Sequence, residues 1–136
     1  MQRTVNNPSP EILENLRSEL RRGSLIVAVL AELRTERYGY TLRKSLEDNG
    51  ITIDEGTLYP LLRRLESQGL LASEWREQDK RNKRFYRLSP EGEVILTHLL
   101  LDWEDLSQSL KAILQRTYSG PAPESSVPSP EAAPQD

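Results

Sequence analysis

The chain has 136 residues, enough for one domain with short flanking segments. It contains no cysteine and a single histidine, which excludes disulfides and thiolate metal sites and argues against a histidine-built zinc site, so we predict no metal or other cofactor. Residues 1–10 are polar, and no window approaches the roughly 20 apolar residues of a membrane span. We therefore expect a cytoplasmic protein with neither a secretory signal nor a membrane segment.

The net charge of −3 hides a strongly basic segment. Three of the 21 acidic residues lie after Arg116, where the chain has no Lys or Arg, so the remainder carries 18 residues of each sign. In residues 80–87, by contrast, five of eight side chains are basic and none is acidic. Local clustering of this kind is a better guide to nucleic-acid binding than the overall pI.

The first third of the chain predicts two helices in succession. Ser9-Pro10 is an N-cap followed by proline at the first helical position. An apolar stripe at helical spacing follows and ends near Gly23: Ile12, Leu13, Leu16 and Leu20. A second, very apolar helix over residues 24–33 is expected to form the centre of the core.

A third helix is predicted over residues 41–48. We expect Tyr38-Gly39-Tyr40 to break the helical structure before it, and Asn49-Gly50 to end it.

The fourth predicted helix, over residues 54–68, has an apolar face and a basic face. Asp54 is its N-cap, and Gly69 ends it. Pro60 removes one backbone donor, but the leucine stripe continues across it, so we expect one helix with a kinked or tightened first turn. The leucines fall in a narrow arc of the helical wheel: Leu58, Leu61, Leu62 and Leu65. Such a rod suits a DNA major groove; a surface helix with a solvated basic face is the alternative.

Two short strands, residues 71–77 and 83–88, are predicted next, joined by the polar link 78–82. Ser89-Pro90 repeats the cap-plus-proline start, and the final helix is expected to run to about Arg116. Its apolar positions follow a near-heptad spacing: Ile95, Leu99, Trp103, Leu106, Leu110 and Ile113.

The order of elements predicts a mostly α fold with a small two-stranded β-hairpin, the order of a winged helix-turn-helix. We divide the chain into an N-terminal arm and helix (1–22), a winged helix-turn-helix DNA-binding domain (23–89), a C-terminal dimerisation helix (90–118) and a tail (119–136). The tail is acidic and rich in proline, and we predict that it is disordered because it cannot bury enough apolar surface.

Several segments closely resemble the PadR family of bacterial transcriptional regulators: residues 20–30, 38–40, 55–66, 69–71 and 84–88. The run Gly56-Thr57-Leu58-Tyr59-Pro60 is the most specific of them, and the resemblance covers roughly residues 15–115. It implies a winged-helix homodimer, most often a repressor, that binds a two-fold symmetric operator. It also implies that Pro60 belongs to the recognition helix and that the C-terminal helix, aided by the N-terminal one, joins the subunits.

Carried onto this sequence, the resemblance implies three groups of DNA contacts. The recognition helix supplies Thr57, Tyr59, Arg63 and Arg64, and the wing over residues 78–84 supplies Lys80, Arg81, Lys83 and Arg84. A solvated loop is the alternative for the wing, and core packing is the alternative for Tyr59. Tyr38 and Tyr40 flank the start of the third helix, where they either meet a phosphate or pack around a glycine turn.

The final helix most simply buries its stripe against a second subunit, because a lone chain would expose it to water. Its six stripe positions named above form the predicted interface, and Ile12, Leu13 and Leu16 add a second layer. Some members of the family bind flat aromatic compounds between subunits through an aromatic on this helix. Trp103 either stacks on such an effector or, as we favour, packs in the interface. His98 lies beside this stripe, which we call the α-helical seam of the predicted interface, and we expect it to be an ordinary surface or interface histidine.

The main prediction is thus a homodimeric repressor that binds double-stranded operator DNA, with release by a small aromatic effector as an added option. A winged-helix module that docks a protein partner is the alternative, although such a module has no need of five basic residues in eight. We predict no enzymatic activity, because the sequence has no phosphate-cradling glycine loop and no constellation for nucleophilic or metal chemistry.

Overall fold

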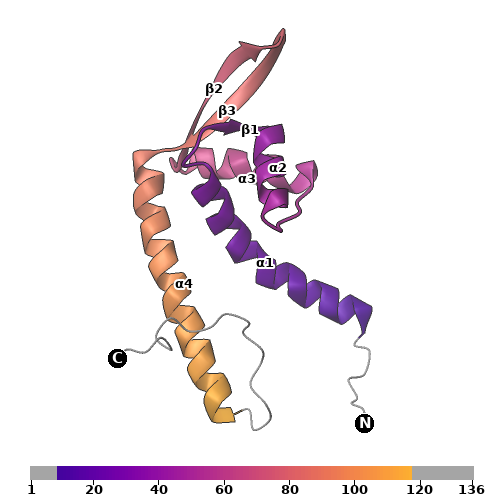
Figure 1. The fold of residues 1–136 in the computed structure, drawn as a ribbon, viewed down its shortest axis with the longest axis vertical. Coiled ribbons are helices and arrows are strands. Elements are labelled where there is room, and N and C mark those ends of the chain that lie inside the picture. Colours follow the sequence, from indigo (N-terminus) through magenta and orange to yellow (C-terminus); the bar gives the residue numbers. More distant parts are fainter. Residues whose placement is uncertain (1–8, 118–136) are drawn as a thin grey trace, which may run out of the picture. The chain divides into compact units, whose positions relative to one another are not determined.

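A computed structural model describes residues 9–117. The chain divides into two units, the first ending at Leu100 and the second beginning at Leu101. In chain order the elements are α1 (Pro10–Glu32), β1 (Arg37–Tyr38), α2 (Gly39–Asp48), α3 (Glu55–Ser67), β2 (Leu71–Gln78), β3 (Arg81–Leu88) and α4 (Pro90–Thr117) (Figure 1). The predicted tail lies outside the described residues. The predicted class is confirmed: mostly helical, with a small antiparallel sheet.

Side-chain caps begin three of the helices, as the sequence predicts. The Ser9 hydroxyl accepts the Ile12 N–H at 3.4 Å at the start of α1, and the Ser89 hydroxyl accepts the Gly92 N–H at 2.9 Å at the start of α4. Asp54 caps α3. Each cap satisfies a backbone donor that the first turn of a helix leaves without a partner.

The predicted break at Gly23 is wrong, because α1 runs without interruption from Pro10 to Glu32. Gly23 is exposed, and a Cβ placed there would have nothing within 4 Å. A single glycine in a helix costs only about 1 kcal/mol relative to alanine, so it does not force a stop when good helix formers flank it. The two helices predicted over residues 10–33 are therefore one.

The sheet has three strands in the order β1-β3-β2, all antiparallel, where the sequence predicts two. The additional strand, β1, has only two residues, too few for any alternating pattern. The hairpin is tighter than predicted: Gln78 pairs with Arg81, and the turn is Asp79-Lys80 alone. Both turn residues have positive φ, 55° and 64°, as in a type I′ hairpin turn. The hairpin projects beyond the helices (Figure 1).

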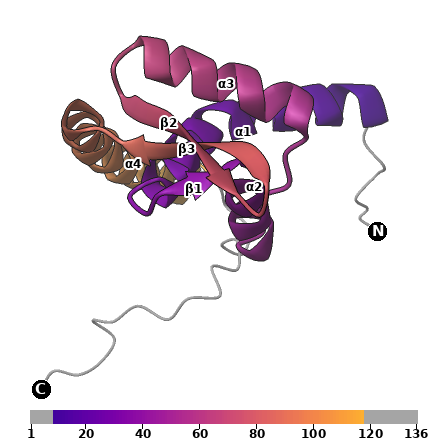
Figure 2. The ribbon, with the colours of Figure 1, turned by 90° about the horizontal axis from the view of Figure 1, so that it is seen from above.

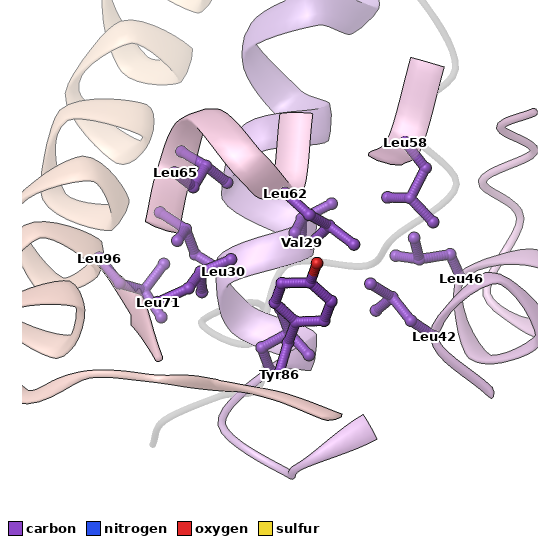
Figure 3. Close-up of a cluster of buried hydrophobic side chains, with 11 residues drawn as sticks. Val29, Leu30, Leu42, Leu46, Leu58, Leu62, Leu65, Leu71, Tyr86 and Leu96 are labelled. Carbon is purple, nitrogen blue, oxygen red and sulfur yellow. The ribbon is translucent and has the colours of Figure 1, made fainter. Parts of the chain in front are cut away.

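The hydrophobic core joins α1, α2 and α3 to the sheet and to the start of α4 (Figure 3). Pro60 does not interrupt α3, which places three of its four predicted leucines in the core and leaves Leu61 partly buried. The buried cluster consists of Val29, Leu30, Leu33, Leu42, Leu46, Leu58, Leu62, Leu65, Leu71, Tyr86 and Leu96. These side chains hold α3 by its leucines and leave the opposite side of the helix free.

The start of α4 is fixed to the end of the α3–β2 connection. A Cβ on Gly92 would overlap the carbonyl oxygen of Leu70, so only glycine allows this approach. The Ser89 N–H donates to the same carbonyl at 3.0 Å, and the Ser89 hydroxyl donates to the Gly69 carbonyl at 2.6 Å. These contacts place the first turn of α4 firmly in the first unit.

The second unit is the continuation of α4, and it exposes apolar side chains along its length. The exposed ones after Leu100 are Leu101, Trp103, Leu106, Leu110, Ile113 and Leu114. The first two positions of the predicted seam differ, because Ile95 and Leu99 are partly buried in the first unit. Within residues 9–117 no helix has the length and apolar character needed to cross a membrane.

Candidate nucleic-acid interface

The outward side of α3 carries its polar and basic residues. Arg63 and Arg64 are exposed, while Leu62 and Leu65 on the opposite side are buried. Neither arginine forms an ion pair within the described part of the chain. Two consecutive residues thus expose guanidinium groups on a helix whose other side is anchored in the core.

The first turn of α3 holds a fixed negative charge. Hydrogen bonding with the Thr57 side chain, and with its N–H at 2.8 Å, lowers the pKa of Asp54 below its ordinary value of 3.8. The carboxylate is favourable at a helix N-terminus because it faces the positive end of the helix dipole. Thr57, a predicted DNA contact, is therefore engaged with the cap.

Tyr59 is half-buried and lies over the start of α2, not fully out in solvent as the helical wheel places it. A Cβ on Gly39 would overlap the Tyr59 hydroxyl and lie 2.7 Å from ring atom Cε1. Gly39, the first residue of α2, thus provides the space in which the Tyr59 ring sits. Between the predicted alternatives of exposure and core packing, the ring takes an intermediate place.

The hairpin presents different side chains on its two faces, because neighbours along a strand point to opposite sides. On one face, Ser73 lies opposite Tyr86, and Trp75 lies opposite Arg84. This face is turned toward α3, whose Glu66 accepts hydrogen bonds from both Ser73 and Arg84. Figure 2 shows α3 running alongside the hairpin.

Arg84 is tied to the protein itself. Its guanidinium donates to Glu66 Oε1 at 3.1 Å and to Ser73 Oγ at 2.9 Å, and Ser73 donates to Glu66 Oε2 at 2.7 Å. The same guanidinium lies over the rings of Trp75 and Tyr86, at 5.5 and 5.7 Å from their centroids. Arg84 therefore joins the hairpin to α3, and two of its five N–H donors are engaged within the protein.

Lys83 lies on the other face of the hairpin, with Tyr38. Its ammonium group donates to the Tyr38 hydroxyl at 3.3 Å and to Gln78 Oε1 at 3.4 Å, and only 18% of its side chain is exposed. The Tyr38 ring also packs edge-on against Phe85, with 5.2 Å between centroids. Tyr38 thus packs around the Gly39 turn and positions a lysine at the same time.

A hollow of about 450 Å³ separates the helices from the hairpin. Its floor includes the Tyr86 ring, and burial raises the pKa of this hydroxyl, which stays neutral near pH 7. The residues around it come from β1, α2, α3 and both long strands, with no Asp or Glu among them: Tyr38, Gly39, Tyr40, Tyr59, Arg63, Trp75, Arg81, Asn82, Lys83, Arg84 and Tyr86. The hollow is aromatic and cationic, a combination that suits an anionic ligand with apolar portions.

Seven of the ten predicted DNA contacts line this hollow, although they come from three separate segments of the sequence. Thr57, Arg64 and Lys80 do not line it. Four lining residues were absent from the sequence prediction: Gly39, Trp75, Asn82 and Tyr86. For Trp75 the signal was available in the strand alternation, which puts it on the face of the hairpin that carries Tyr86.

Three helices followed by a projecting hairpin, with a basic side of α3 left outside the core, define a winged helix-turn-helix protein. The model of the family described as "Transcriptional regulator PadR-like family" matches residues 26–98, from the apolar half of α1 to the first turns of α4. The chain belongs to this family. It is therefore a DNA-binding transcriptional regulator and not an enzyme.

Relatives with solved structures share the fold. A PadR family transcriptional regulator from Eggerthella lenta is 46% identical, with a TM-score of 0.72 over 76% of this chain and 93% of that one. A PadR-like transcription factor from Bacteroides fragilis is 32% identical, with a TM-score of 0.64 over 73% of this chain and 98% of that one. The transcriptional regulator Rv3488 of Mycobacterium tuberculosis is 41% identical over 75 residues, 55% of this chain and 70% of that protein.

Proposed function

We propose that the protein is a homodimeric repressor that binds a palindromic operator through α3 and the wing over residues 78–84. The observation that carries the proposal is the hollow between these two elements, which gathers cationic and aromatic side chains and has no acidic one in its lining. A positive, partly apolar surface beside a recognition helix matches the chemistry of duplex DNA. DNA binding itself agrees with the family; the contacts, the dimer and the operator symmetry are the proposal.

The two elements have different tasks in this proposal. Arg63 and Arg64 project from α3 and are long enough to pair with guanine O6 and N7 in the major groove. Lys80 and Arg81 are exposed at the tip of the hairpin and contact phosphates, which positions the protein without reading sequence. Arg84 contributes indirectly, since its hydrogen bonds to Glu66 of α3 and to Ser73 hold the hairpin in place.

Dimerisation is supported by the apolar surface that a single chain leaves in water. Leu106 and Leu110 of α4 are 68% and 56% exposed, and Leu20 of α1 is 77% exposed. Monomeric proteins rarely expose apolar stripes of this kind, so we expect a second copy of the chain to bury them. Ile12 and Leu16 are exposed as well and are part of the same proposal, whereas Leu13 is half-buried.

Release by a small aromatic effector would act through Trp103. Trp103 is 48% exposed on α4 and offers a flat face for stacking. The same exposure is expected of a tryptophan that packs against a second subunit, so the two roles are separated only by a binding experiment.

Selection of the purified protein against a pool of random duplexes tests the main proposal. We expect enrichment of a two-fold symmetric sequence with half-sites about one helical turn apart. Enrichment of an asymmetric site would overturn the palindromic operator and keep the DNA-binding surface. Absence of any binding at low salt would favour the alternative, a winged-helix module that docks a protein partner.

Two arginine variants separate base reading from phosphate binding. Arg63→Ala should change the preferred sequence, whereas Arg81→Ala should weaken binding to all duplexes alike and reduce the salt dependence by about one phosphate contact per subunit. Arg17→Ala is the matched control, since it removes one exposed positive charge from α1, outside the hollow. Equal losses on all sequences for both hollow variants would mean that α3 does not read bases.

The dimer is tested independently of DNA. Replacing Leu106 and Leu110 with glutamate should give a monomer by light scattering that no longer binds the selected site tightly. A dimer of unchanged mass would refute the α4 seam.

A further inference from the structure

Trp75 is a large exposed aromatic for which neither the core nor the sequence prediction provides a role. It lies in β2, opposite Arg84, and 62% of it is exposed. It takes no part in the buried cluster, and the Arg84 guanidinium at 5.5 Å is its stacking partner among the described residues. Most of the indole surface is therefore available to a partner.

The position of Trp75 places it in the wall of the hollow, on the hairpin side. Tyr40, Tyr59 and Arg63 line the hollow from the helices, and Arg81 lines it with Trp75 from the hairpin. Tyr40 is also 61% exposed, so accessible aromatic surface lies on both sides of the hollow. The wall of the hollow thus combines cationic and aromatic side chains from both sides.

The identity of the occupant follows from the proposed function, on which this inference rests. If α3 enters the major groove and the hairpin tip reaches the adjacent groove, the sugar–phosphate strand that separates the two grooves has to pass between them. The hollow is the space between these two elements. Its cations match the phosphates of that strand, and its aromatic walls match the deoxyriboses, which are the apolar part of the backbone.

We infer that Trp75 is a DNA-backbone contact: its indole packs on a deoxyribose of the strand seated between α3 and the hairpin, and its Nε1–H donates to an adjacent phosphate oxygen. Indole nitrogen is a donor only, so it pairs with an anionic oxygen and not with the surrounding cations. Arg81, from the same side of the hollow, neutralises a neighbouring phosphate. The contact is independent of sequence, because every nucleotide presents the same sugar and phosphate.

Intrinsic fluorescence tests this inference with a duplex of mixed sequence, because no knowledge of the operator is needed. The chain has two tryptophans, so the Trp75→Phe variant retains Trp103 as its only one. At low salt we expect the duplex to quench and shift the emission of the wild-type protein, and the difference from Trp75→Phe to account for most of the change. Binding is followed in parallel by anisotropy of a labelled duplex, so that the emission is compared at equal saturation.

Affinity provides the second readout. Trp75→Ala should weaken binding by roughly three- to tenfold per subunit and Trp75→Phe by less, since an aromatic contact of this size is retained in part. The slope of log affinity against log salt should stay unchanged for Trp75→Ala, because no charge is removed, whereas Arg81→Ala lowers it. Thermal unfolding of both tryptophan variants should match that of the wild-type protein, given the exposure of the side chain.

The possible outcomes are distinct. Saturable binding with no emission change from Trp75, or wild-type affinity for Trp75→Ala, would overturn the inference and leave the proposed DNA surface intact. Emission of Trp75 that is already shifted to the blue without DNA would also overturn it, since another subunit or a small ligand would then cover the indole. Absence of binding to any duplex would remove the proposed function and this inference together.

Discussion

The bond network between α3 and the hairpin makes a quantitative prediction about Glu66. Its carboxylate accepts one hydrogen bond from Ser73 at 2.7 Å and one from Arg84 at 3.1 Å. Hydrogen bonds to charged groups contribute roughly 1.5–3 kcal/mol when buried. The Glu66 and Arg84 side chains are 27% and 37% exposed, so solvent screening reduces the Arg84–Glu66 part to about 1 kcal/mol.

A double-mutant cycle measures that part. The four proteins are wild type, Glu66→Ala, Arg84→Met and the double variant, with methionine chosen to keep the aliphatic stem of Arg84. Urea unfolding is followed by circular dichroism at one fixed protein concentration, because dimerisation makes the apparent stability depend on concentration. We expect Glu66→Ala to lose roughly 2 kcal/mol and the cycle to give a coupling of about 1 kcal/mol.

Arg87→Met is the matched control for the cycle. Arg87 lies in the same strand, is exposed, and forms no ion pair within the described part of the chain, so its replacement should change stability by less than about 0.5 kcal/mol. A coupling between Glu66 and Arg84 below about 0.3 kcal/mol would refute the reasoning. Arg84 would then be available for DNA, as the sequence predicts, and its replacement would lower the salt dependence of binding as much as Arg81→Ala.

Three further predictions test local features. Gly23→Ala should stabilise the protein by about 1 kcal/mol in urea unfolding, because α1 is continuous there; a neutral or negative effect would indicate a break in the helix. Gly39→Ala should displace the Tyr59 ring and weaken DNA binding, with no further loss when it is added to Tyr59→Ala; additive losses would mean that the ring does not depend on this space. The Asp54 pKa is lowered on folding, so its contribution to stability is complete above pH 3.8 and is lost as the pH falls through the folded value. The Asp54 carboxyl should titrate below 3.8 by NMR together with the Thr57 N–H, and a midpoint at or above the ordinary value would contradict the cap.

Features set by neighbours in sequence were predictable. The caps at Ser9, Asp54 and Ser89 are local chemistry, and the leucine stripe of α3 follows from helical spacing alone. The stripe even predicted correctly that the helix continues through Pro60. Where one residue had to be weighed against a long helix, as at Gly23, the local signal was misleading.

Features that depend on contacts between distant segments were not predictable from the sequence. Arg84 was grouped with the free cations of the wing because its partners come from another strand and from a helix 18 residues away. Lys83 is engaged by Tyr38, which is 45 residues away in the chain. The half-buried position of Tyr59 depends on the missing side chain of Gly39, and a helical wheel does not include a neighbouring helix.

The two-residue turn at the tip of the hairpin has a consequence for how this protein is able to change. Asp79 and Lys80 both hold left-handed backbone angles, which Asn-Gly would adopt at lower cost. An Asn-Gly tip would carry no cation, however, whereas the present turn places an ammonium group at the most protruding point of the hairpin. Replacing the two residues by Asn-Gly would therefore relieve backbone strain and remove one positive charge at the same time. In the proposed complex with DNA, the strained turn is thus a point at which stability and phosphate contact make opposite demands on the same two residues.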